Sequence, residues 1–477
     1  MKTKLHSLFV VLALLLGIHQ AAAQGTMVFP IATNGAASQA SFSAAFGGTN
    51  YLVGIQGDGT TNYFDISAQV VSTNGSLVGS RILIGRTGGN PFVAFGGTNF
   101  LLVWPDDALL TNGGNDQVYG QFVSRSGALV GSPFTFGPTS EEQSFQGVEQ
   151  LAFDGNNYLV VWDTGISSSN APNGDVHGVL FNQTGSMVVP TIDVTSGAIS
   201  ALTPSVTFGK TNYLVVWNNR RSGNTELYDI YGEFVSTNGT QGSAFVISQT
   251  PTPSYNPCCA AFDGTNFFVV WNKDIGPGYP SPNDWNFYGR LLSQTGNFPG
   301  NEVAMVTDTN NPIYPILAFD GANYLMAWHG GLTNSQVQFQ FFNSSITAIG
   351  PEFNLFSQQG TNAPIFGGVI FDGKRFEITS TVGGNTGGRF TSSTGVWGAF
   401  IPKSTASPTM TASNLVGTQF PLQLTGTPGI NYAVQFSTNL ALSNWTAVVT
   451  NSPTNGTFNF TDPQATNTSR FYRAMKQ

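Results

Sequence analysis

Residues 262–271 read FDGTNFFVVW, and this stretch decides the fold because the chain repeats it. Variants of the phrase occur seven times, with successive copies 49 to 58 residues apart. The copies begin at Phe46, Phe95, Phe153, Phe208, Phe262, Phe319 and Phe371. In the middle five copies, the apolar run that follows ends in a tryptophan. A repeat at a nearly constant interval indicates one supersecondary unit per copy.

Each unit is predicted to contain two β-hairpins. The segment 263–266 (DGTN) places turn-forming residues between two apolar runs, as in a tight turn that accepts positive φ. The run 213–217 (YLVVW) is apolar at every position, which is typical of a strand covered on both faces. A second phrase, clearest at 231–239 (YGEFVSTNG), alternates more and predicts an outer hairpin. Four strands in a repeat of this length are the content of one propeller blade.

We therefore predict an all-β fold, a β-propeller of about seven blades followed by a small β-sandwich. A single blade has two apolar faces, and stacking the blades around an axis buries them. Ring closure is expected to use the segment Met27–Ile31 as the outer strand of the last blade. Six or eight blades are alternatives. A β-solenoid is disfavoured because its coils usually repeat at shorter intervals.

The first 23 residues are predicted to be an export signal. Lys2 and Lys4 precede the apolar run 8–18, and the alanines at 21–23 supply a small-residue cleavage site. The apolar run is shorter than a spanning helix requires, and no other stretch is long and apolar enough. The protein is thus expected to be secreted, with no membrane span.

The mature chain is predicted to have two domains. Residues 24–402 form the propeller, and residues 403–477 form the second domain, which begins at the polar stretch KSTASP (403–408). The repeat does not resume there, and short alternating strands such as 432–436 (YAVQF) take its place. This pattern favours a small sandwich of the immunoglobulin or fibronectin type.

The repeats resemble the FDGTNYLVVW-type repeats of many large secreted bacterial proteins, which are usually treated as propeller-like. The resemblance covers about residues 25–400. The last segment, with 434–440 (VQFSTNL), Asn444-Trp445 and 470–473 (RFYR), resembles a C-terminal module of secreted environmental bacterial proteins. These resemblances imply a propeller with an accessory or adhesion module, and they imply no particular activity.

Composition argues against nucleic acid as a partner. Removing the signal lowers the 17 Lys and Arg residues to 15 against 25 Asp and Glu, a net charge near −10. Nucleic-acid binding needs the opposite sign. The two cysteines, Cys258 and Cys259, are adjacent, so they cannot form a disulfide framework. Two reduced or buried thiols are expected, with a strained vicinal disulfide as the alternative.

Residues that could hold a metal ion or act as a general base are sparse. Only His177 and His329 remain in the mature chain, and they occupy different parts of different repeats. The phrase also carries a recurring aspartate, at Asp154, Asp263, Asp320 and Asp372. Each stands alone before its turn, which favours an Asx turn over a calcium loop. The sialidase repeat S-x-D-x-G-x-x-W is not found, and we expect no cofactor and no metal site.

Ligand contacts are predicted on the loops that follow the tryptophan strands. These loops vary most among the repeats and span 105–117, 163–174, 218–226 and 272–284. Variable loops on a constant scaffold are the usual layout of a binding face. The predicted ligand-binding residues are Asp163, Asn218, Asn272 and His329 for polar contacts, with Trp285 and Tyr279 for stacking. Packing between blades is the alternative role of such aromatic residues.

Two functions from different classes stay open. The first is a secreted, monomeric, non-catalytic binding or adhesion protein with a glycan or a protein as its ligand. The second is a secreted glycan-processing hydrolase or lyase, which needs two converging carboxylates. Loop carboxylates that could supply them are Asp106, Asp107, Asp163, Asp175, Asp274 and Asp284. A purely structural surface component is a third possibility.

Overall fold

The structure is a computed structural model of the whole chain. It describes residues 26–476 apart from the segments 34–38, 58–64, 86–87, 106–116, 138–149, 165–173, 197–199, 222–226, 253–257, 275–284, 307–311, 331–335, 356–364, 383–384, 387–388, 391–394, 404–408, 413–419, 426–431, 439–444, 452–456 and 463–470. The predicted signal and Tyr279 lie outside the described residues.

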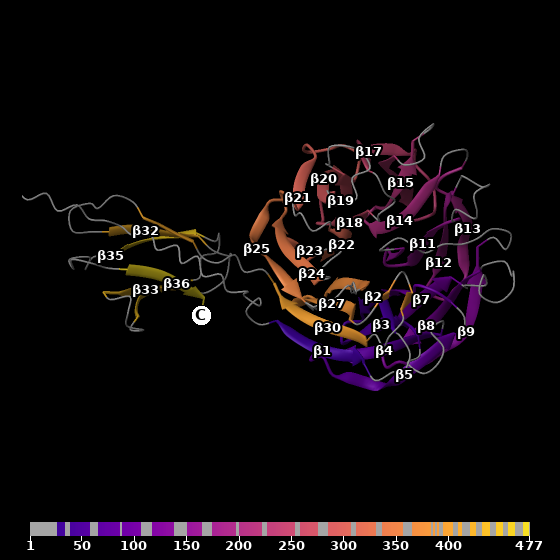
Figure 1. Cartoon of the computed structure of the whole chain (residues 1–477), viewed down its shortest axis with the longest axis horizontal. Coiled ribbons are helices and arrows are strands. Elements are labelled where there is room, and N and C mark those ends of the chain that lie inside the picture. Colours follow the sequence, from indigo (N-terminus) through magenta and orange to yellow (C-terminus); the bar gives the residue numbers. More distant parts are fainter. Residues whose placement is uncertain are drawn as a thin grey trace, which may run out of the picture.

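The predicted all-β propeller is confirmed. Between residues 27 and 402 the described strands form seven four-stranded antiparallel sheets, each containing one copy of the phrase, set around a common axis (Figure 1). We number these blades 1 to 7 in the order of the copies. The innermost strands are β2 (Ala40–Phe46), β6 (Phe92–Phe95), β10 (Leu151–Phe153), β14 (Ala201–Phe208), β18 (Cys259–Phe262), β22 (Ile313–Phe319) and β26 (Ile365–Phe371).

Three more strands complete each blade outward from the axis. The second strands are β3 (Asn50–Gln56), β7 (Asn99–Pro105), β11 (Asn157–Asp163), β15 (Asn212–Arg220), β19 (Asn266–Asp274), β23 (Asn323–Gly330) and β27 (Arg375–Val382). The third strands are β4 (Ile66–Ser72), β8 (Val118–Ser124), β12 (Val176–Asn182), β16 (Tyr228–Ser236), β20 (Trp285–Ser293), β24 (Gln336–Asn343) and β30 (Gly395–Pro402). The outermost strands are β5 (Leu77–Gly85), β9 (Leu129–Phe136), β13 (Met187–Asp193), β17 (Phe245–Thr252), β21 (Val303–Val306), β25 (Ala348–Leu355) and β1 (Met27–Ala32).

Blade 7 is completed by the first described strand of the chain, as predicted. β1 pairs antiparallel with β30, with Met27 opposite Phe400 and Phe29 opposite Gly398. The ring is therefore closed by strands from both ends of the propeller segment. Along the chain, the second and third strands of this blade are separated by a short hairpin of β28 (Asn385–Thr386) and β29 (Arg389–Phe390).

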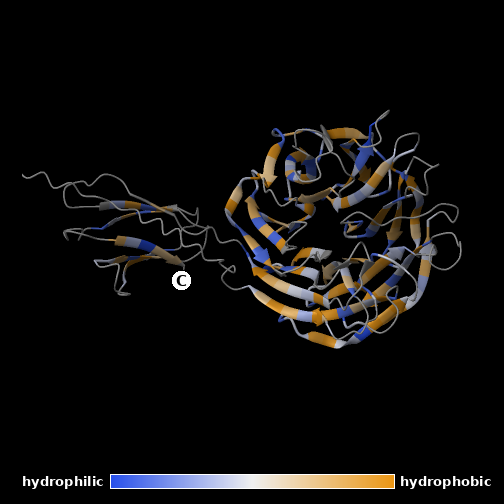
Figure 2. Cartoon of the chain, viewed as in Figure 1, coloured by the Kyte–Doolittle hydropathy of each residue, from blue (hydrophilic) through white to orange (hydrophobic). Residues whose placement is uncertain are grey.

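Seven hydrophobic clusters hold the ring together, one between each pair of neighbouring blades. The second strands are buried on both faces, and Figure 2 shows hydrophobic residues along the strands around the whole ring. Each repeated tryptophan packs into the cluster shared with the preceding blade; these are Trp104, Trp162, Trp217, Trp271 and Trp328. Burial of large apolar side chains is the main stabilising contribution in such an interface.

Neither of the two cysteines is in a disulfide, and both are buried. Cys258 packs between blades 4 and 5, and Cys259 packs between blades 5 and 6. The expectation of two buried thiols is therefore confirmed.

The described strands between residues 409 and 476 form two three-stranded sheets outside the ring. One sheet has the order β31 (Thr409–Ala412), β32 (Phe420–Thr425), β35 (Thr457–Asp462), and the other has the order β34 (Thr446–Asn451), β33 (Tyr432–Ser437), β36 (Phe471–Lys476). The connection starts at Lys403, whose Nζ donates to the Asp320 carbonyl at 3.1 Å and lies 4.5 Å from the centre of the Phe371 ring. The chain thus leaves the propeller on the face that carries the phrase turns. No helix in the described part of the chain is long and apolar enough to cross a membrane.

Candidate functional site

Four of the predicted site residues occupy one equivalent position, directly after the repeated tryptophan. Side chains alternate between the two faces of a strand, so the tryptophan faces the preceding blade and the next residue faces the following one. We call this place the post-tryptophan position; it holds Pro105 in blade 2 and the four predicted residues Asp163, Asn218, Asn272 and His329 in blades 3 to 6. All four side chains are buried.

Asp163 and Asn218 meet at Thr203 on the inner strand of blade 4. The Thr203 backbone N donates to Asp163 Oδ2 at 3.0 Å, and Asn218 Nδ2 donates to Thr203 Oγ1 at 2.7 Å. Thr203 has a φ of 51°, which is a rare conformation for a β-branched residue. The structure therefore brings these two predicted residues together, and their hydrogen bonds hold a strained inner strand between blades 3 and 4.

Asn272 and His329 lie on blades 5 and 6. Asn272 Nδ2 donates to the Pro312 carbonyl, which lies at the entry to blade 6. His329 has no hydrogen-bond partner for either ring nitrogen among the described residues, and burial lowers its pKa to about 4. A neutral imidazole is therefore favoured at neutral pH.

Of the two aromatic candidates, the structure describes only one. Trp285 begins β20, where it is half-buried and its backbone is paired with that of Asp274 on β19. Tyr279 lies outside the described residues, so its part in a site stays a prediction.

Acidic side chains on the described loop edges are engaged in local contacts. Asp175 Oδ1 accepts a hydrogen bond from Thr195 Oγ1 at 3.1 Å, and Asp163 holds Thr203 as described above. The side chains of the other loop acids, Asp106, Asp107, Asp274 and Asp284, lie outside the described residues. Convergence of a catalytic carboxylate pair therefore stays a hypothesis for those four.

The phrase aspartates cap their own turns. In Asp154, Asp263, Asp320 and Asp372, Oδ1 accepts hydrogen bonds from the backbone N of the residues two and three positions later, at 2.7 to 2.9 Å. The predicted Asx turns are confirmed. The residue after the aspartate has positive φ, for example 95° at Gly264, which explains the glycine there. The described residues contain no group of three or more His, Cys, Asp or Glu that could hold a metal ion.

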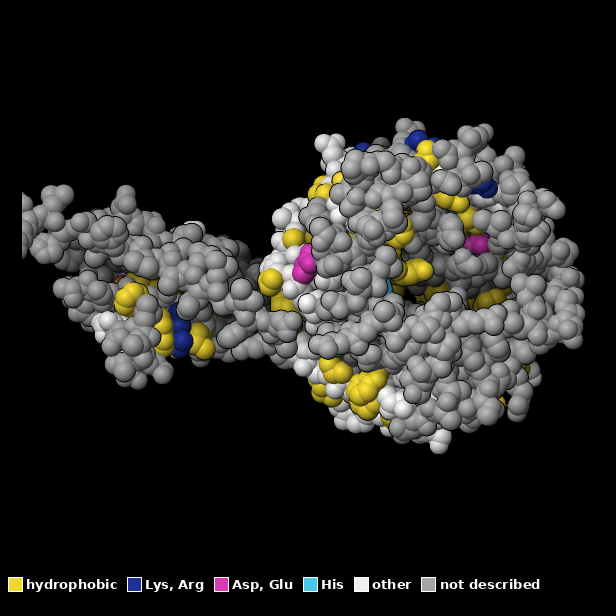
Figure 3. Space-filling view, in the orientation of Figure 1, with side chains coloured by type: hydrophobic (Ala, Val, Ile, Leu, Met, Phe, Trp, Pro, Cys, Tyr) yellow, Lys and Arg dark blue, Asp and Glu magenta, His cyan; other side chains and the backbone are white. Residues whose placement is uncertain are grey.

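A cavity of about 410 Å³ lies on the ring axis, and the inner strands of all seven blades contribute to its lining. Figure 3 shows the hollow at the centre of the ring, with hydrophobic side chains visible inside it. The described residues that line it are mostly apolar, and none of them is charged. Ser43, Gln150 and Thr207 supply the polar side chains. The volume lies within the usual range for small-molecule sites.

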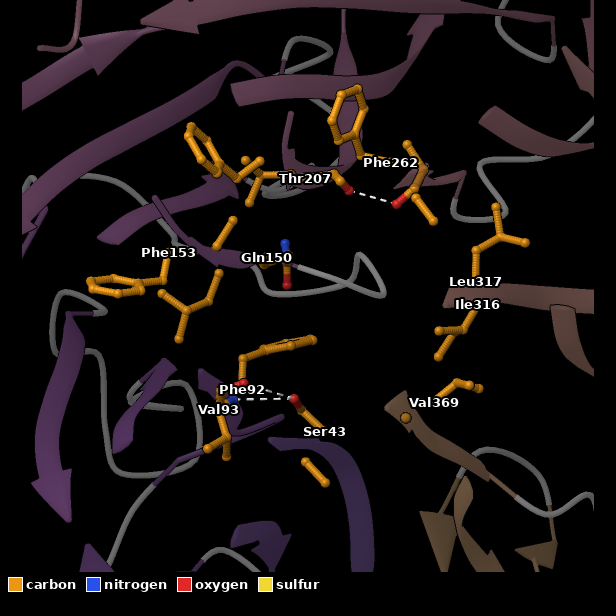
Figure 4. A pocket seen from close by; sticks show the side chains of 18 of the residues that line it. Ser43, Phe92, Val93, Gln150, Phe153, Thr207, Phe262, Ile316, Leu317 and Val369 are labelled. Carbon is orange, nitrogen blue, oxygen red and sulfur yellow. Dashed lines mark hydrogen bonds between the residues drawn. The ribbon is translucent and has the colours of Figure 1, made fainter. Parts of the chain in front are cut away.

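The three polar side chains of the axial cavity differ in what they bind. Ser43 Oγ accepts from the Val93 backbone N at 3.1 Å, and Thr207 Oγ1 donates to the Ala260 carbonyl, so both hydroxyls join neighbouring inner strands. Gln150 is fully buried, and neither its Nε2 nor its Oε1 has a hydrogen-bond partner within the described part of the chain. Figure 4 shows its carboxamide pointing toward the middle of the cavity.

Of the six predicted ligand-binding residues, none of the five that the structure describes lines the axial cavity, and sequence reasoning missed Gln150. A signal was available in an alignment of the inner strands on the phrase phenylalanine. Three residues before it, Gln150 is the one carboxamide among Ser43, Phe92, Ser205, Cys259, Ile316 and Gly368. The predicted site rested instead on the tryptophan strands and the loops that follow them.

No protein-family model matches the chain, and no curated protein matches it. Among solved structures, the chain is similar to the β-propeller domain of the trilobed protease from Pyrococcus furiosus, with 8% identity, a TM-score of 0.43, and coverage of 72% of this chain and 92% of that one. It is similar to the acylaminoacyl peptidase of Pyrococcus horikoshii at 9% identity and a TM-score of 0.42, covering 82% of this chain. The chain spans only 58% of that peptidase.

A third similar structure is the catalytic domain of a GH62 α-L-arabinofuranosidase from Coprinopsis cinerea, with 12% identity and a TM-score of 0.34. The match covers 56% of this chain and 94% of that domain. At such low identities and TM-scores, these similarities carry no conclusion about activity.

Proposed function

We propose that this chain is a secreted, non-catalytic binding protein that takes a neutral glycan into the axial cavity. The observation that carries the proposal is the cavity itself, a space of about 410 Å³ lined by inner strands of all seven blades, whose described lining residues carry no charged side chain. A ligand with a net charge would lose its hydration there without gaining a counter-charge, so a neutral ligand is favoured.

The side chains that line the cavity favour a sugar as the ligand rather than an extended protein surface. The ring of Phe92 points toward the middle of the cavity and offers an apolar face, and Gln150 offers a hydrogen-bonding group. A pyranose ring has the same combination, with apolar C–H faces and hydroxyl edges. A concave site with apolar walls and few polar groups suits a small moiety, such as one sugar unit of a glycan.

The described lining also supports binding without chemistry. It contains no carboxylate, imidazole or thiol that reaches the cavity, and the hydroxyls of Ser43 and Thr207 are bound to neighbouring strands. General acid–base catalysis of glycoside cleavage needs two carboxyl groups beside the scissile bond.

The test is a glycan array probed with the mature protein from Gln24 onward, with reducing-end release measured on every hit. Ala152→Phe fills the axial cavity from a half-buried position in its lining, and Ala128→Phe makes the same change on an exposed rim hairpin. We expect binding without release, lost in Ala152→Phe and kept in Ala128→Phe, with both variants folded by circular dichroism. Release of sugar, binding that survives Ala152→Phe, or binding of a protein ligand with no glycan hit would overturn the proposal.

A further inference from the structure

Gln150 stands apart from the other buried glutamines of the propeller. Gln69 Nε2 donates to the Val70 carbonyl at 3.0 Å, Gln121 Nε2 to the Phe122 carbonyl at 2.9 Å, and Gln340 Nε2 to the Gly350 carbonyl at 3.1 Å. Gln56 Nε2 donates to the Gly88 carbonyl at 3.1 Å. These four amides fasten backbone segments, whereas both polar atoms of Gln150 lack a partner among the described residues.

The backbone of Gln150 is fixed where its side chain points inward. The Val161 backbone N donates to the Gln150 carbonyl at 3.0 Å, which continues the pairing of β10 with β11. The side chain is fully buried and projects into the axial cavity (Figure 4). A buried amide without a partner is costly, and such groups in native proteins are usually satisfied by a ligand or by ordered water.

A carboxamide constrains the ligand more than a hydroxyl does. Its NH₂ group donates and its carbonyl accepts, side by side in one plane. A matching ligand presents an acceptor and a donor at the same spacing, as two adjacent hydroxyls of a sugar do. The ring of Phe92, in the same lining, offers an apolar face against which a sugar ring can pack.

We propose that Gln150 is the specificity-determining residue of the axial cavity and that it recognises two adjacent hydroxyls of a neutral sugar. This inference rests on the proposed function and deepens it by naming the residue and the ligand group. Charged sugars are excluded because the described lining holds no opposite charge.

Two matched substitutions separate recognition from stability. Gln150→Leu removes the unpartnered amide at nearly constant volume, so we expect a melting temperature equal to or above that of the parent. Gln121→Leu removes an amide that holds the Phe122 and Val130 carbonyls far from the cavity, so we expect a lower melting temperature and unchanged binding. Opposite effects of the two substitutions on binding and stability distinguish a ligand contact from a structural one.

The experiment titrates the parent and both variants with the methyl glycosides of glucose, galactose, mannose and xylose, and with the glucuronic acid derivative. For each sugar that binds, analogues lacking one hydroxyl follow. We expect Gln150→Leu to weaken binding about tenfold to a hundredfold. Loss of either recognised hydroxyl should weaken binding to the parent but not to Gln150→Leu, as a double-mutant cycle requires.

The two proposals fail in different ways. Equal binding of neutral sugars by the parent and Gln150→Leu would overturn the role of Gln150 and leave the proposed function standing, with water as the partner of the amide. Preference for the glucuronic acid derivative would overturn the neutral-ligand inference. No binding of any glycan, on the array or in these titrations, would overturn the proposed function itself.

Discussion

The second residue of the repeated phrase lies against an aromatic residue of the next blade. That aromatic residue is the second residue of the second strand of its blade. In blade 1 it is Gly47, and a Cβ there would lie 2.6 Å from Cζ of Phe100 on blade 2. In blade 7 it is Asp372, whose Oδ2 accepts a hydrogen bond from the Tyr51 hydroxyl of blade 1 at 2.6 Å. The alternation of Asp and Gly among the copies is therefore explained in part by the neighbour. Glycine leaves room for a ring, and aspartate accepts from a hydroxyl.

The Tyr51 hydroxyl should contribute to stability because Asp372 is buried beneath it. In Tyr51→Phe a buried carboxylate loses a donor, and we expect the free energy of unfolding to fall by about 1.5–3 kcal/mol. Tyr158→Phe is the matched control, because the Tyr158 hydroxyl makes only a long contact of 3.4 Å to the Asn99 carbonyl. Guanidinium denaturation of both variants measures the difference, and equal losses would contradict the role assigned to Asp372.

Residue-level prediction from sequence succeeded where the cause was local. An aspartate before a glycine turn binds its own backbone, so the Asx turns were predictable without knowledge of any neighbour. The direction of the post-tryptophan side chain follows from strand alternation, but its partner does not. Asp163 binds Thr203, forty residues later and on another blade. Gln150 was missed for the same reason, since its unpartnered state depends on six other inner strands.

At the scale of strands, the ring depends on one element that is distant in sequence from its sheet. β1 is the outer strand of blade 7, and its Phe29 packs on Phe400 with ring centres 4.6 Å apart. The repeat count and the lone apolar strand at the start of the mature chain made this closure predictable. The pairing register was not predictable, because it is set by the bulge between Pro30 and Ala32 and by packing on blade 1.

Phe29 should anchor the closing strand. It is 4% exposed, and Phe29→Ala opens a cavity between blades 7 and 1, so we expect the free energy of unfolding to fall by about 3–5 kcal/mol. Met27, on the same strand, is 41% exposed, and Met27→Ala should cost less than about 1 kcal/mol. Denaturant midpoints and protease resistance compare the two variants. A small effect of Phe29→Ala would mean that β1 is not needed to hold the ring closed.

At the scale of the whole molecule, the interface between blades 7 and 1, which closes the ring, contains several buried polar side chains. The Ser41 backbone N donates to Thr381 Oγ1 at 2.9 Å, and Ser41 Oγ donates to Thr379 Oγ1 at 3.4 Å. On the same face of β27, Glu377 is fully buried, and its carboxyl has no hydrogen-bond partner among the described residues. The equivalent residues of the other blades are apolar: Leu52, Leu101, Leu159, Leu214, Phe268 and Leu325.

The carboxyl of Glu377 makes the stability of the closed ring depend on pH. Burial, with a smaller contribution from the negative charge of nearby Asp372, raises its pKa to about 8, and Arg375 partly opposes this rise. In the unfolded chain its pKa is about 4.5, so the unfolded state ionises first as pH rises. The contribution of Glu377 to the free energy of unfolding is fully present below about pH 4.5, decreases as pH rises toward 8, and is constant above that. The slope of this decrease is at most about 1.4 kcal/mol per pH unit.

Glu377→Gln removes the ionisation and keeps the shape of the side chain. We expect the variant to match the parent near pH 4.5 and to become progressively more stable than the parent as pH rises to 8, because only the parent must keep a carboxyl protonated in the closure interface. Glu352→Gln removes a carboxyl from an exposed position on β25 and is the control for the loss of one acidic group. Chemical denaturation at half-unit steps between pH 4.5 and 8.5 gives the difference curve directly, without the contributions of groups that all three proteins share. A difference between Glu377→Gln and the parent that is constant across this range would show that Glu377 is ionised in the folded ring, and that the closure interface supplies it with a donor or with water.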